Sequence, residues 1–119
     1  MAMFLTQLVV APVGNGRLWI TASPFLVESD IVGAIEVPAG FIFDGNSLPR
    51  ATWWASPPSD YLEAGCVHDF LYRYGTDRKL ADGVYREILA LKGMGRVRRN
   101  LRYAALRLFG RRAFKGQSQ

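Results

Sequence analysis

Short runs of hydrophobic residues, separated by turn-forming residues, make up the first 43 positions of the chain. Such runs, bounded by glycine, proline and asparagine, are typical of β-strands. Five of them predict strands: 3–10, 17–21, 24–27, 35–37 and 41–43. The segment 12–16 carries proline, glycine and asparagine, and predicts the turn of a hairpin. The pattern therefore predicts a β-rich part over residues 1–43.

The hydrophobic period lengthens after a loop at 44–58, and three helices are expected. Ser59 or Asp60 caps the first helix, which reaches about residue 74 and ends at Gly75. Thr76 or Asp77 caps the second, which ends at Gly93. Its apolar stripe, which predicts its buried face, consists of Leu80, Val84, Ile88 and Leu91.

The third helix is expected from 96 to 108, basic and amphipathic, and ended by Gly110. Its predicted buried side consists of Val97, Leu101, Ala104, Ala105 and Leu108. Together these elements predict one α+β domain over 1–119. A β-rich part packs on two antiparallel helices, the helical part spans 59–112, and a tail follows at 113–119.

Charge is distributed unevenly along the chain. The net charge is +5, but nine of the fifteen positive residues follow position 91 and no acid does. The first 91 residues therefore hold six positive and ten acidic residues, a net charge of −4. An anionic membrane surface, nucleic acid or an acidic patch on a partner protein could each bind the basic helix, and a solvated face with no partner is the other alternative. Sequence-specific nucleic-acid binding is not expected, because the chain carries no recognised reader motif.

Several classes of protein are excluded by composition. One cysteine cannot form an internal disulfide, and one cysteine with one histidine cannot close a structural zinc site. No run of about 20 apolar residues predicts a membrane span. The first positive charge is Arg17, so the basic start of a signal peptide is missing and secretion by that route is not expected.

The segment 64–73 holds the candidate chemistry. His68 is the only histidine, Asp69 follows it, and Tyr72 lies four residues on, on the same face of the expected helix. Histidine exchanges a proton near neutral pH, so acid–base chemistry is expected here if the chain is an enzyme.

Two resemblances extend this prediction. The segments 37–41 and 44–49, the pattern His68-Asp69-x-x-Tyr72 and the basic segment 107–110 resemble a family of short phage and prophage proteins of unassigned function. His68, Asp69 and Tyr72, with the Gly-Asn loop at 45–48 and Ala81-Asp82, also resemble the secreted and parvoviral phospholipases A2.

The second resemblance implies roles for six residues. His68 would activate water. Asp82 would orient the His68 ring through a hydrogen bond, and Tyr72 would support that hydrogen bond. Asp69, with Asp44 and the backbone around Gly45, would bind calcium, which takes six to eight oxygen ligands. The expected function is a phage-encoded, calcium-dependent ester hydrolase acting on phospholipid.

The alternative is a non-catalytic virion or assembly component of the tail or neck. It would bind other virion proteins through the basic helix. Either protein would be found in the phage virion or the host cytoplasm.

Overall fold

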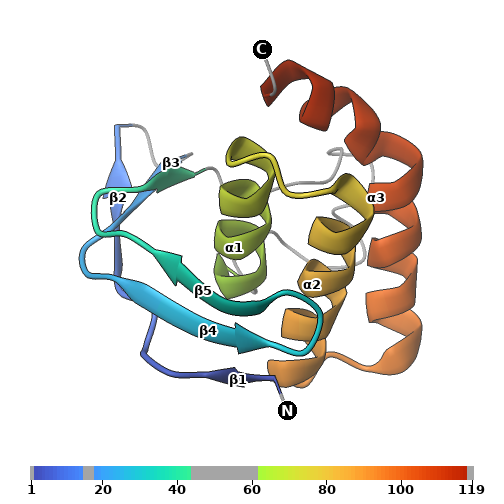
Figure 1. Ribbon diagram of the computed structural model, residues 1–119, viewed down its shortest axis with the longest axis horizontal. Helices are drawn as coiled ribbons and strands as arrows, with labels where there is room; N and C mark the ends of the chain where they lie inside the picture. Colours follow the sequence, from blue (N-terminus) through green and yellow to red (C-terminus); the bar gives the residue numbers. More distant parts are fainter. Residues whose placement is uncertain (1, 15–17, 44–61, 118–119) are drawn as a thin grey trace.

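Two small antiparallel sheets and three helices form the fold seen in a computed structural model, which describes residues 2–14, 18–43 and 62–117, and side chains as far as Leu108 (Figure 1). One sheet has the order β1-β4-β5, with strands Met3–Phe4, Phe25–Ser29 and Gly33–Val37. The other has the order β2-β3-β6, with strands Val10–Val13, Leu18–Thr21 and Ile42–Phe43. The predicted α+β class is confirmed.

The long strand predicted at 3–10 is instead two strands in different sheets. The chain leaves the first sheet at Thr6, whose hydroxyl accepts a hydrogen bond from the Leu26 amide at 2.9 Å and replaces a backbone partner. Strand β2 then pairs Pro12 with Trp19, so Pro12 belongs to a strand and not to the predicted turn. Proline is tolerated there because β2 is an edge strand.

The helices are α1 (Leu62–Arg73), α2 (Arg78–Leu91) and α3 (Arg96–Gln117). Asp77 caps α2, accepting from the amides of Lys79 and Leu80, which decides between the two predicted caps. Gly75 and Gly93 follow the helices with φ of +81° and +90°, a conformation that favours glycine. The caps predicted at 59 and 60 lie outside the described residues.

The buried face of α2 is rotated from the predicted stripe. Leu80 and Leu91 are exposed. The helix packs against α1 on one side and α3 on another, so its buried side is wider and includes a carboxylate. Its buried residues are Ala81, Asp82, Val84, Tyr85, Ile88 and Leu89.

The predicted buried face of α3 is wrong except at Ala105, which is partly buried against the core. Val97 is 73% exposed, Leu101 52% and Leu108 74%, while Arg102 and Leu106 are buried. The helix also continues beyond Gly110, where it was expected to end. Polar contacts with α2 account for the rotation: Arg102 donates a hydrogen bond to the Tyr85 hydroxyl at 2.7 Å.

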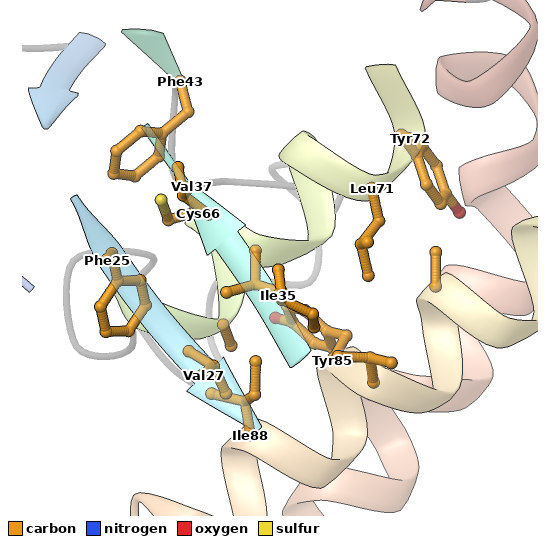
Figure 2. Close-up of a cluster of buried hydrophobic side chains, with 14 of the residues drawn as sticks. Phe25, Val27, Ile35, Val37, Phe43, Cys66, Leu71, Tyr72, Tyr85 and Ile88 are labelled. Carbon is orange, nitrogen blue, oxygen red and sulfur yellow. The ribbon is translucent and has the colours of Figure 1, made fainter. Parts of the chain in front are cut away.

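The hydrophobic core lies between the sheet β1-β4-β5 and helices α1 and α2 (Figures 1 and 2). Alternate side chains of β4 and β5, namely Phe25, Val27, Ile35 and Val37, are buried. They pack with residues of the helices, among them Cys66 and Ile88 (Figure 2). Of the helices described, none is both long enough and apolar enough to span a bilayer. Helix α1 is thereby held with one side on the sheet and the other towards α2.

Candidate functional site

The candidate site is a buried polar cluster between α1 and α2, with contributions from α3. The two first helices run antiparallel across a short connection, which places the last turns of α1 beside the first turns of α2 (Figure 1). His68 and Tyr72 lie one turn apart on α1, and Asp82 lies opposite them on α2. His68 is 1% exposed, Tyr72 3% and Asp82 0%. These three predicted residues are brought together by the fold.

Asp82 accepts hydrogen bonds from both α1 side chains. One carboxylate oxygen, Oδ1, lies 2.7 Å from His68 Nε2 and 2.5 Å from the Tyr72 hydroxyl. The Tyr72 ring lies against the imidazole, with the ring centroids 4.1 Å apart. The imidazole is thus fixed both by a charge-assisted hydrogen bond and by ring packing.

The second carboxylate oxygen of Asp82 is bound by Arg107 of α3, at 3.0 Å from Nη1. Burial by itself would raise the pKa of the Asp82 carboxyl. The hydrogen bonds from His68 and Tyr72, the charge of His68 and the hydrogen bond from Arg107 outweigh burial and lower that pKa. Asp82 is therefore ionised at neutral pH.

An ionised Asp82 decides which nitrogen of His68 carries the proton. A carboxylate is only an acceptor, so Nε2 of the ring must donate to it. In the neutral imidazole the acceptor nitrogen is then Nδ1. Tyr72 also keeps its proton, because burial and then the hydrogen bond to Asp82 raise its pKa. A histidine with one nitrogen anchored by an acid is the arrangement used in general base catalysis, which also requires that the other nitrogen reach the substrate.

A second arginine of α3 extends the cluster. The Tyr85 ring meets the His68 ring edge-on, with centroids 5.2 Å apart, and its hydroxyl accepts from the buried Arg102. Arg78 of α2 donates to the carbonyl oxygens of Leu106 and Arg107 at 3.1 and 2.6 Å. Helix α3 is thus fixed to α2 on both sides of Asp82, and its arginines take part in the site.

The predicted calcium ligands are only partly described. Asp69 is buried, and its carboxylate lies 3.4 Å from Arg73 Nη2, one turn further along α1. Asp44 and Gly45 lie outside the described residues. Within the described ranges no three His, Cys, Asp or Glu side chains are grouped as a metal site would require. A carboxylate such as that of Asp69 is one kind of oxygen ligand that calcium takes.

Cys66, one turn before Phe70 on the buried side of α1, is not an available nucleophile. Burial raises the pKa of its thiol to about 12, and the charges of Asp69 and Glu63 act in the same direction. At neutral pH the thiol is protonated, and a thiol reacts as a nucleophile only as its thiolate. The chemistry of the cluster therefore depends on the imidazole.

Sequence reasoning did not identify Arg102, Arg107 and Tyr85 as members of the cluster. All three lie on helices whose predicted buried faces exclude them or do not name them. Basic residues on a predicted solvent face usually remain solvated or bind an external partner, so the number of arginines on α3 did not indicate contacts inside the protein. One feature of the sequence could have linked Arg102 to the buried side of α3: it lies four residues before Leu106, and residues at this spacing share a helix face.

The fold and the cluster define a class: small α+β proteins with a His–Asp–Tyr cluster between two antiparallel helices. The chain belongs to a family of proteins of unknown function, DUF1353, whose model matches residues 19–106. No curated protein and no solved structure matches the chain. The matched region contains His68, Tyr72 and Asp82 and ends one residue before Arg107.

Proposed function

We propose that this chain is a phage-encoded, calcium-dependent ester hydrolase acting on phospholipid, with a site similar to that of the phospholipases A2. The observation that supports the proposal is the 2.7 Å contact between His68 Nε2 and Asp82 Oδ1. The sequence pattern by itself did not require residues 68 and 82 to be in contact. A carboxylate on one ring nitrogen is what a histidine base needs.

In this proposal His68 acts through Nδ1. The ring accepts a proton from water at Nδ1 as that water attacks the ester carbonyl, and becomes an imidazolium. Asp82 stabilises the positive charge through Nε2, and Tyr72 and Arg107 hold the carboxylate in place. The imidazolium then returns the proton to the leaving alcohol.

Calcium would be held by Asp69 together with Asp44 and the backbone of Gly45. When bound, it supplies positive charge to the ester carbonyl oxygen. Asp69 Oδ2 lies 3.4 Å from Arg73 Nη2, and the Arg73 side chain is 43% exposed and can move into water if calcium takes this oxygen. Arg73 and calcium would therefore compete for one carboxylate.

The test is fatty-acid release from phospholipid vesicles, measured with calcium and with chelator. His68→Asn and Asp82→Asn are each expected to lower the rate by at least about a hundredfold, the usual contribution of a general base. Asp77→Asn is the matched control, since it makes the same change at an exposed helix cap. Release that is absent from the wild type, or unchanged in His68→Asn, would rule out the proposal.

A second function is favoured by one observation, the 1% exposure of His68. A base must reach its substrate, whereas a histidine that only joins two helices is best kept buried. On this hypothesis the chain is a non-catalytic virion or assembly component, and the His68–Asp82 pair is a structural contact. Mass spectrometry of purified phage particles tests it: the protein should be present at a fixed copy number, and its absence would contradict the hypothesis.

A further inference from the structure

Helix α3 carries an apolar stripe on its outward side. Val97, Leu101, Ala104 and Leu108 are all exposed, three of them by more than half. Their spacing of four, three and four residues aligns them along one face over three turns. Arg102 and Leu106, which are buried, mark the opposite side. The stripe therefore does not belong to the core, although a helix of this pattern normally buries it.

The charges beside the stripe indicate what could cover it. Arg96 and Arg98 are exposed next to Val97, and no acidic residue occurs from Lys92 to the end of the chain. A second copy of this helix would bring together two faces that carry arginines and no acid of their own, and like charges repel. Nucleic acid would attract the arginines but would leave the leucines without an apolar partner. The occupant must be both anionic and apolar.

A bilayer containing anionic phospholipid meets both requirements. Amphipathic helices lie in the interface of such bilayers, with leucine and valine among the acyl chains and arginine at the headgroups. Exposed apolar residues in one row on a convex helix suit a flat, deformable surface, and α3 forms one outer edge of the molecule (Figure 1).

We propose that the outward face of α3, formed by Val97, Leu101, Ala104 and Leu108 with Arg96 and Arg98, docks onto anionic phospholipid bilayers. The surface is distinct from the His68 cluster, which lies on the opposite side of α3. Docking would place the protein on the surface that holds its proposed substrate, but the docking itself requires no hydrolysis.

The test is co-sedimentation of the full chain with vesicles, in the presence of chelator so that calcium-dependent hydrolysis cannot contribute. Vesicles of phosphatidylcholine with phosphatidylglycerol are expected to bind, and vesicles of phosphatidylcholine alone to bind at least about tenfold more weakly. Leu101→Gln/Leu108→Gln should weaken binding to the anionic vesicles by about a hundredfold, since two leucines no longer enter the apolar layer. Glutamine is nearly as good a helix former as leucine, so α3 should be preserved.

Leu80→Gln is the matched control, because Leu80 is 43% exposed on α2, away from the stripe. It should bind like the wild type, and circular dichroism should be the same for all three proteins. Arg96→Gln/Arg98→Gln should bind more weakly and with less dependence on salt.

Three results would overturn the proposal. The first is a wild type that fails to sediment with anionic vesicles at low salt, and the second is a double leucine variant that binds as well as Leu80→Gln. The third is a lipid-free dimer in analytical ultracentrifugation that only the double leucine variant loses, which would assign the stripe to a second copy. A protein that binds vesicles but releases no fatty acid would retain this inference and reject the hydrolase.

Discussion

Asp82 is a fully buried carboxylate with hydrogen-bond donors at both oxygens. His68 and Tyr72 bind Oδ1, and Arg107 binds Oδ2. Removing an ion from water is costly, and the cost is offset only when its lone pairs are satisfied by well-placed donors. The cluster meets this condition for Asp82. The same residue is therefore central to the proposed chemistry and to the packing of three helices.

Asp82→Asn should lower the free energy of unfolding by about 2–4 kcal/mol. The amide cannot accept from all three donors, and the buried ring of His68 loses its charged partner. Chemical denaturation measures the change. Asp77→Asn should change stability by less than about 0.5 kcal/mol, because asparagine caps helices as well as aspartate. Equal losses in the two variants would mean that the buried hydrogen bonds contribute nothing specific.

The lowered pKa of Asp82 predicts a dependence of stability on acid. Because this pKa is lowered in the folded state, the folded protein binds fewer protons than the unfolded chain. The resulting stability is complete above the unfolded pKa of about 4 and is lost as pH falls through the folded value. Urea denaturation between neutral pH and about pH 2.5 should show a smaller acid-induced loss in Asp82→Asn than in the wild type. Parallel curves would contradict this assignment.

At the level of residues, the cluster was only partly predictable from sequence. His68 and Tyr72 share a helix face because their spacing is four, which a sequence shows directly. Asp82 was linked to them by resemblance, and its place depended on which edge of α2 faces α1. Arg107 lies 25 residues beyond Asp82 on another helix, so only the packing of α3 could reveal its contact.

Helix α3 illustrates why an apolar stripe is an uncertain guide to the buried face. Leu106 is buried in the core with Ala105 packed partly against it, and several contacts between α3 and α2 are polar. Arg102 binds the Tyr85 hydroxyl, Arg107 binds Asp82, and Arg86 stacks on the Tyr103 ring at 4.6 Å. These interactions set the rotation of the helix and leave the stripe outside. By contrast, the C-terminal end of α1 and both ends of α2 were predicted within a few residues, because Gly75, Asp77 and Gly93 mark them locally.

The observed rotation of α3 predicts opposite results for two neighbouring leucines. Leu106→Ala should lower the free energy of unfolding by about 2–4 kcal/mol, since Leu106 is fully buried. Leu108→Ala should change it by less than about 0.5 kcal/mol, because that side chain is 74% exposed. Denaturant unfolding of both variants provides the comparison. If the apolar stripe were the buried face, Leu108→Ala would lower the free energy of unfolding more than Leu106→Ala.

On the scale of the whole molecule, the strands and the helices are joined by more than the hydrophobic core. Ser29, at the end of β4, donates to Glu87 Oε1 of α2 at 2.7 Å, and the Asp30 amide donates to Oε2 at 3.0 Å. The Ser29 hydroxyl also accepts from the amides of Ile31 and Val32. The turn between β4 and β5 is thus attached to α2. Such a contact, 58 residues apart in sequence, has no local pattern that would predict it.

Glu87→Gln should loosen this attachment without unfolding the protein. Only one of the two side-chain atoms remains an acceptor, and it is neutral. One donor, the Ser29 hydroxyl or the Asp30 amide, therefore loses its acceptor, at a cost of about 1–2 kcal/mol. Amide hydrogen exchange at Asp30 should accelerate more than exchange at core amides of α2, because the turn would open locally before the whole fold does.

Glu36→Gln, which changes an exposed acid on β5, is the matched control and should leave exchange at Asp30 unchanged. If both variants accelerate Asp30 equally, the effect comes from net charge, and the turn is held by β4–β5 pairing alone. If only Glu87→Gln does so, the carboxylate of α2 holds the turn and joins the sheet to the helices that carry the His68 cluster.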